Sequence, residues 1–170
     1  MTLVNELKSL LNEVRNLFAG DYLVSVPTLA IGSNKDDVAS TAFDYVINGT
    51  RYSKAAVTTG TGPGDDVIPQ SKYGAVAFDI GTNGTIDAIE ATDNATGYAS
   101  AALAVAGLPA VAADHVRMGY VTATKSDGAF TFGTTDLNAA NTTVAYTDAT
   151  AGPAGLSAAI TTSDLALTGL

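Results

Sequence analysis

The sequence predicts a mainly β protein, an antiparallel β-sandwich or small barrel with an N-terminal amphipathic α-helix. The β assignment rests first on three turn dipeptides, Asn48-Gly49, Asn83-Gly84 and Asp127-Gly128, because such pairs between β-branched segments favour hairpins. Apolar and polar residues also alternate around these pairs, as they do in half-buried strands. A long apolar stripe with helical spacing occurs near the start of the chain. We therefore divide the chain into a helix at 1–20, a β-domain at 21–150 and a C-terminal extended arm at 151–170.

The N-terminal segment carries one apolar stripe with the a/d spacing of a coiled-coil seam. The residues of this helix seam are Leu3, Leu7, Leu10, Val14 and Leu17. Thr2 is suited to cap the helix and Gly20 to end it. Two heptads are too few to hold a coiled coil alone. The seam is therefore expected to pack on the protein's own core, on sister copies or on a partner surface, and the sequence does not choose among these.

The β-domain is expected to contain further strands, one loop and one short helix. Residues 21–31 form a strand-like run bent at Pro27, and residues 142–148 form a late strand. The Gly- and Pro-rich stretch 58–66 predicts an exposed loop. The Ala-rich stretch 98–115 predicts a short helix that ends near Gly107.

The C-terminal arm begins with a flexible Gly/Pro stretch and ends almost without charge. Its apolar residues are Leu156, Ile160, Leu165 and Leu167. An apolar terminal segment without an evident partner strand predicts an arm that docks on another molecule. The alternative is that it supplies the last strand of the domain.

Composition limits the partners and the chemistry. The net charge is −9, from 17 acidic and 8 basic residues, which disfavours nucleic acid as a partner because phosphate binding depends on Lys and Arg. No stretch approaches the roughly 20 apolar residues of a membrane-spanning helix, and charged residues interrupt the N-terminus where a signal peptide would be apolar. The chain has no cysteine, which excludes disulfides, thiolate zinc sites and cysteine nucleophiles. We expect a soluble protein that binds neither nucleic acid nor a membrane.

Residues 79–90, DIGTNGTIDAIE, partly match the calcium-loop pattern D-x-[DN]-x-[DN]-G-x5-E. The match covers Asp79, Asn83, Gly84 and Glu90, but Gly81 removes one ligand. An EF-hand loop also needs a helix on each side, whereas the residues before Asp79 are strand-like. The pattern therefore predicts a β-hairpin that turns at Asn83-Gly84, with no metal site.

No set of residues predicts catalysis or a cofactor site. His115 is the only histidine and lacks the partners of a triad or of a zinc site. The acidic groups Asp36-Asp37, Asp65-Asp66, Asp87/Glu90 and Asp93 fall mostly in Gly- and Asn-rich loops, where solvated charge is the ordinary role. Phosphate-loop, dinucleotide and nucleophile-elbow motifs are absent from the sequence. We therefore expect a protein that is not an enzyme.

Three segments together resemble a protein family: TLAIGSNKDDVASTAFDYVINGTRYSKAA, ATGYASAALAVAGLPAVAADHVRMGYVTATKSDGAFTFGTTDL and VAYTDA. They are similar to the head auxiliary proteins of tailed bacteriophages, which are decoration or cement proteins and head-fibre components. The resemblance spans roughly residues 28–150, and its motifs are turn and Ala/Pro patterns.

The resemblance implies a non-enzymatic, β-rich virion protein, made in the host cytoplasm and located on the capsid surface. Its implied partners are the major capsid protein and sister copies of itself. A homotrimer is the first expectation and a dimer the alternative. Proteins of this group often grip the shell with a terminal segment, for which the helix seam and the C-terminal arm are the two candidates.

Two other functions fit a chain of this type. One is a tail-fibre or baseplate module of the same kind of virion. The other is a carbohydrate-binding β-sandwich module, which requires exposed aromatic side chains on one face. The tyrosines that would supply such a platform are Tyr45, Tyr52, Tyr73, Tyr98 and Tyr120.

Overall fold

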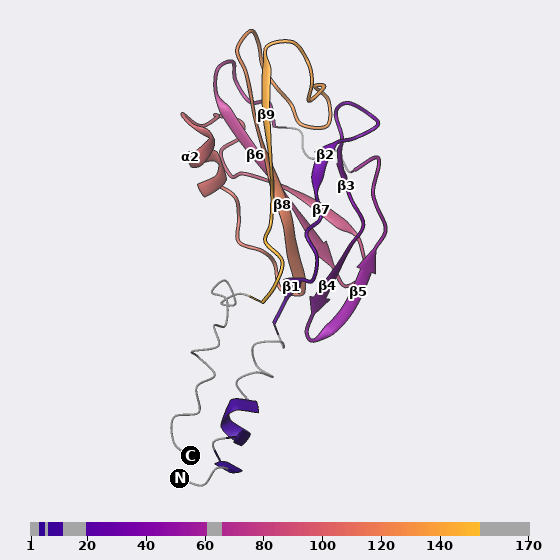
Figure 1. Cartoon of the computed structure of the whole chain (residues 1–170). Coiled ribbons are helices and arrows are strands. Elements are labelled where there is room, and N and C mark those ends of the chain that lie inside the picture. Colours follow the sequence, from indigo (N-terminus) through magenta and orange to yellow (C-terminus); the bar gives the residue numbers. More distant parts are fainter. Residues whose placement is uncertain (1–3, 6, 12–19, 61–65, 154–170) are drawn as a thin grey trace, which may run out of the picture.

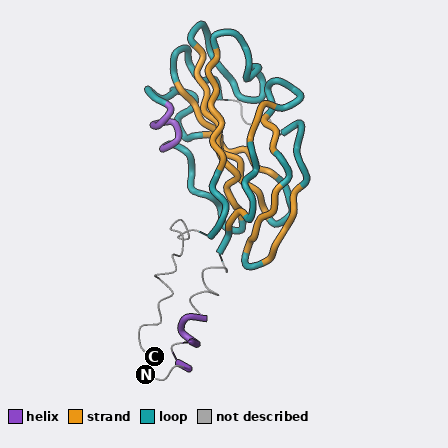
Figure 2. The backbone as a smooth tube through the Cα atoms, viewed as in Figure 1, coloured by secondary structure: helices purple, strands orange, loops and turns teal. Residues whose placement is uncertain are grey.

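The computed structural model describes residues 4–5, 7–11, 20–60 and 66–153. The described chain is mainly β with antiparallel sheets, which confirms the predicted fold class (Figures 1 and 2). Within the described residues, no helix is both long enough and apolar enough to cross a membrane.

The larger layer is a four-stranded sheet in the order β7-β6-β8-β9. Its strands are β6 (Tyr73–Gly81), β7 (Ile86–Glu90), β8 (His115–Lys125) and β9 (Thr142–Asp148). The strand predicted at 142–148 is therefore confirmed. Every neighbouring pair in this sheet is antiparallel.

The second layer consists of two smaller antiparallel sheets, β1-β4-β5 and β2-β3. Their strands are β1 (Tyr22–Leu23), β2 (Leu29–Ile31), β3 (Val38–Ser40), β4 (Phe43–Ile47) and β5 (Thr50–Lys54). The expected bend at Pro27 separates β1 from β2, so the run at 21–31 contributes one strand to each small sheet. The two layers enclose the main core, as in a β-sandwich.

Aliphatic and aromatic side chains from both layers make up this core. The small sheets supply Leu23, Leu29, Val38, Phe43, Tyr45 and Ile47, and the large sheet supplies Val76, Phe78, Ile80, Val116, Met118, Val121 and Ala123. Each large side chain that leaves water in this way stabilises the fold by about 1.5–3 kcal/mol. Alternation along the strands therefore decides which face of each sheet is buried.

Two of the three predicted hairpins are confirmed. Asn48 and Gly49 have φ angles of 51° and 74°, the pair of positive values that a two-residue type I′ turn needs, and they join β4 to β5. The turn between β6 and β7 is longer. Gly84 has a φ of 74° and its N–H donates to the Gly81 carbonyl at 3.0 Å, so only the glycine of the Asn83-Gly84 pair is left-handed.

The third predicted hairpin, at Asp127-Gly128, is wrong. The chain leaves β8 after Lys125, and Phe130 forms a two-bond bridge with Ile68, while β9 occupies the edge beside β8. Phe130 and Phe132 are both 1% exposed and pack edge to face, with ring centroids 4.9 Å apart. Burial of two phenylalanines contributes more than the preference of one dipeptide for a turn, because sheet and turn preferences span only about 1 kcal/mol.

A short helix, α2 (Ala101–Ala106), covers part of the outer face of the large sheet. The Ser100 side chain caps it by accepting from the Leu103 N–H, and Gly107 ends it, as the sequence predicts. Ala104 packs there with Ala75 and Ala91, in a second small core.

The N-terminal helix and the C-terminal arm are described only in part. Residues 4–5 and 7–11 are helical, which agrees with the predicted helix, and of the helix seam Leu7 and Leu10 are 62% and 55% exposed. Outside the described residues lie the following predicted positions: Leu3, Val14, Leu17, Asp65, Leu156, Ile160, Leu165 and Leu167.

Candidate interface at the terminal end of the domain

The β-domain has one end at which both flanking segments join it, and we call this the terminal end. The Gly152 N–H donates to the Leu23 carbonyl at 2.7 Å, which ties the last described loop to the first strand. Figure 1 shows the described chain entering at β1 and leaving after β9 at this same end. Residues 1–20 and 151–170, the two predicted attachment segments, are therefore connected to one end of the molecule.

An open groove lies beside these two junctions. It is lined by Asp21, Tyr22, Leu23, Val111, Ala112, His115, Val116, Arg117, Thr150 and Gly152. Apolar side chains are also exposed near the start of the domain and in the loop before β8, since Val24, Val26 and Val111 are 38%, 43% and 39% exposed. The groove at the terminal end thus combines polar side chains with the partly exposed Val111.

The turn of the β4–β5 hairpin bonds to two segments of the chain that border the groove. The Asn48 backbone N–H donates to Asp21 at 2.8 Å, and its side-chain amide donates to Asp114 at 2.5 Å. Asp114 itself has a φ of 58°, a left-handed conformation that Asp and Asn adopt more readily than most residues. One asparagine therefore holds together the segment that enters β1 and the segment that enters β8.

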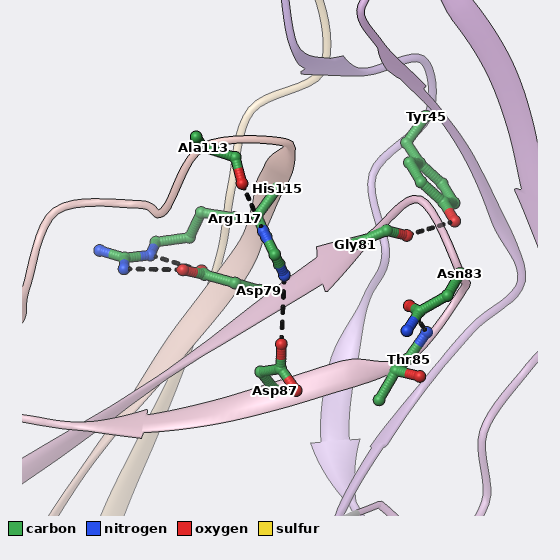
Figure 3. Close-up of polar contacts among 9 residues, drawn as sticks. All are labelled: Tyr45, Asp79, Gly81, Asn83, Thr85, Asp87, Ala113, His115 and Arg117. Carbon is green, nitrogen blue, oxygen red and sulfur yellow. Dashed lines mark hydrogen bonds and ion pairs between the residues drawn. The ribbon is translucent and has the colours of Figure 1, made fainter.

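An ion pair with a buried carboxylate lies on the outer face of the large sheet, beside the groove (Figure 3). Asp79 on β6 is 0% exposed, and Arg117 on β8 donates to both of its carboxylate oxygens, at 2.8 and 3.1 Å. Arg117 also donates to the Pro109 carbonyl at 2.9 Å, which ties down the loop before β8. The buried carboxylate accepts two charge-assisted hydrogen bonds, which compensate for its removal from water. Loss of the arginine would leave an unpaired buried charge and destabilise the folded state.

A β-bulge brings this pair into register. The pairing of β6 with β8 shifts between Phe78 and Asp79, so that Phe78 lies opposite Gly119 and Asp79 opposite Arg117. The extra residue, Met118, points into the core and is 1% exposed. The bulge therefore places Arg117 on the outer face of the sheet, beside Asp79, while Met118 fills the core.

His115 links β8 to the neighbouring loop and to β7 (Figure 3). Its Nδ1 lies 2.8 Å from the Ala113 carbonyl and its Nε2 lies 3.2 Å from an Asp87 carboxylate oxygen. Both ring nitrogens face acceptors, so only the imidazolium can donate to both. The Ala113 hydrogen bond, with support from Asp87, raises the pKa of His115 above its ordinary value, although partial burial acts in the opposite direction.

The residues of the calcium-loop pattern lie in a β-hairpin, as predicted, and several of their polar groups bond to residues of that hairpin and of β4 and β8. Asp79 is held by Arg117, and the Asn83 side-chain oxygen accepts from the Thr85 N–H at 2.8 Å. The Gly81 carbonyl accepts from the Tyr45 hydroxyl at 3.1 Å. In the part of the chain that the structure describes, no group of three or more Asp, Glu or His side chains is arranged to hold a metal ion.

The other acidic residues that the sequence singles out belong to separate elements. Asp36 and Asp37 lie between β2 and β3, where Asp37 is buried and accepts from the Asn34 amide at 3.1 Å. Asp87 and Glu90 lie on β7, and Asp93 lies in the loop that follows it. Of these residues, Asp87 contributes to the terminal end, through its ion pair with His115.

Sequence reasoning identified His115 but missed its neighbour Arg117 and the buried pair with Asp79. A signal was present in the segment HVRMG, where a glycine interrupts the alternation of a strand. Glycine inside a strand often marks a bulge. The residue that lies opposite Asp79 is set by the register of β6 with β8. Local sequence does not determine that register.

The five tyrosines do not form one exposed aromatic face. Tyr45 is 1% exposed in the main core, where Tyr52 stacks on it with ring centroids 5.3 Å apart. Tyr73 and Tyr98 pack instead against the small core under α2. Tyr120 also lies on the side of α2. These residues are divided between the two layers and offer no common sugar-stacking platform.

Comparison of the chain with known protein families, curated proteins and solved structures gives no match.

Proposed function

We propose that this protein is a non-enzymatic structural component of a tailed-phage virion, which decorates the capsid surface and stabilises the shell by binding the major capsid protein. The observation that carries the proposal is the junction at the terminal end, where Gly152 bonds to Leu23. Two predicted attachment segments that start side by side can reach one surface together. The sandwich then points away from that surface.

The helix seam supplies the contact between sister copies in this proposal. Leu7 and Leu10 are more than half exposed in the single chain, as are Val4 and Leu11 on the same helix. Apolar area gains roughly 25 cal/mol per Å² when it leaves water, so an exposed leucine stripe favours association. Three helices packed around a symmetry axis would bury the seam, and two would bury part of it.

Binding to the capsid is tested by cosedimentation of the full chain with purified heads of the phage that carries it. We expect saturable binding by the unmodified chain and loss of binding by Leu10→Asp. Leu103→Asp is the matched control, because Leu103 on α2 is 53% exposed, nearly the same as Leu10 at 55%. Equal binding by all three chains would overturn the role of the helix seam. Binding of the unmodified chain to purified tails, and not to heads, would identify a tail-fibre or baseplate module instead.

A further inference from the structure

The second edge of the large sheet is β9. Among the described strands, β9 pairs with β8 alone and so ends the sheet (Figure 1). Exposed edge strands present free backbone groups that can pair with another chain, and natural proteins usually protect them with charges, proline or bulges. β9, with the sequence TTVAYTD, has no charge before its last residue, no proline and no bulge.

The other edges carry charges. β7, at the far edge of the same sheet, contains Asp87 and Glu90, and β5, at an edge of a small sheet, contains Arg51 and Lys54. Charged side chains on an edge disfavour pairing with another strand. Among these three edge strands, β9 is therefore the one whose sequence least disfavours pairing with a strand of another chain.

The hydrogen-bond pattern shows which backbone groups of β9 are free. The bonds from the Ala149 N–H to the Met118 carbonyl and from the Ser126 N–H to the Asn141 carbonyl continue the β8–β9 ladder at its two ends. Bonded pairs recur at every second residue of an antiparallel ladder, so the odd-numbered residues of β9 bond to β8. The backbone groups of Val144 and Tyr146 point away from β8 and have no hydrogen-bond partner among the described residues.

These free groups are self-complementary. If two copies of β9 pair antiparallel around Ala145, the Val144 of each copy lies opposite the Tyr146 of the other. Each such pair exchanges both N–H···O bonds, so the free groups of both residues are used. A β-branched residue opposite an aromatic residue is a favourable cross-strand pair. Asp148 then lies opposite Thr142, so no like charges face each other.

We propose that β9 is a strand-addition site whose partner is the β9 strand of a second copy, which joins two four-stranded sheets into one continuous sheet. Val144 and Tyr146 are half-buried against the main core, and the added strand covers their remaining surface. A single pair of strands buries little surface area, so the contact is weak. It therefore forms where the local concentration of the protein is high, for example between neighbouring copies on a lattice. It uses a surface distinct from the helix seam and does not depend on binding to a capsid.

Residue-resolved amide hydrogen exchange on the full chain tests this proposal. We expect the Val144 and Tyr146 amides to exchange at least about tenfold more slowly in concentrated than in dilute protein. Ala145→Lys and Ala145→Glu each place like charges across the two-fold axis at an exposed position, and each alone should abolish that protection. A mixture of the two variants should restore it, because opposite charges then face each other.

Thr50→Lys and Thr50→Glu, at an exposed position of β5, are the matched controls and should leave both amides as in the unmodified chain. Exchange rates that do not change with protein concentration would overturn the proposal. Protection that survives Ala145→Lys would also overturn it, because another segment would then cover the edge.

Discussion

The interior of the sandwich and the N-terminal helix are both rich in aliphatic side chains, but only the interior keeps them from water. Ile47, Ile68 and Ile80 are 0% exposed, whereas Leu10 and Leu11 are 55% and 67% exposed. The β-domain therefore completes its own core without the described part of the helix. The apolar surface of the helix is available for a second molecule, so changes in the two regions should have different effects.

The largest effect on stability is expected from Arg117→Met, which leaves the Asp79 carboxylate buried without its partner. Loss of one partner of a buried pair typically costs about 3–5 kcal/mol. Chemical denaturation should therefore show a much lower free energy of unfolding. The double variant with Asp79→Leu should recover part of the loss, because it removes the buried charge. A single variant as stable as the unmodified chain would show that the pair does not hold this end together.

A smaller loss is expected from Asn48→Ala, which removes the side-chain hydrogen bond to Asp114 and places alanine at a φ of 51°. Together these changes should lower the free energy of unfolding by about 1–3 kcal/mol. Asn48→Gly separates the two causes, because glycine tolerates the backbone angle but lacks the side chain. Equal losses in both variants would assign the whole effect to the side-chain hydrogen bond with Asp114.

How far local sequence determines structure is visible at the hairpin turns. The Asn48 turn could be predicted because its two residues need the left-handed angles that Asn and Gly favour. The turn at Asp127-Gly128 could not, because Phe130 and Phe132 enter the core and draw the chain across to Ile68. The Asp79–Arg117 pair likewise depends on the register of two distant strands. Sequence patterns thus predicted the fold class and most elements, whereas contacts across the sheet required the structure.

The pH dependence of stability is expected to depend on His115, the single histidine of the chain. Its raised pKa means that the folded state binds the proton more tightly than the unfolded state. This stabilisation is full below the ordinary pKa of 6.5 and is lost as the pH rises through the raised value. The melting temperature should therefore fall as the pH rises above about 6.5. His115→Gln should remove that slope, and an unchanged slope in this variant would contradict the assignment.

The smallest effect is expected from calcium. Asp79 is held by Arg117 and the Asn83 oxygen by the Thr85 N–H, so the hairpin offers the ion few free ligands. Neither millimolar calcium nor EDTA should change the melting temperature. A rise with calcium that EDTA reverses would show that the loop binds the ion.

The most direct test of the central claim is the mass of the full chain by light scattering, at a low micromolar concentration at which a single strand pair is dissociated. We expect an oligomer for the unmodified chain and for Leu103→Asp, and the 17.1 kDa monomer for Leu10→Asp, with the same melting temperature in all three. Unfolding of Leu10→Asp would contradict this expectation, because the helix would then belong to the core of the domain. A mass unchanged by Leu10→Asp would equally contradict it, because the helix seam would not be the contact between copies.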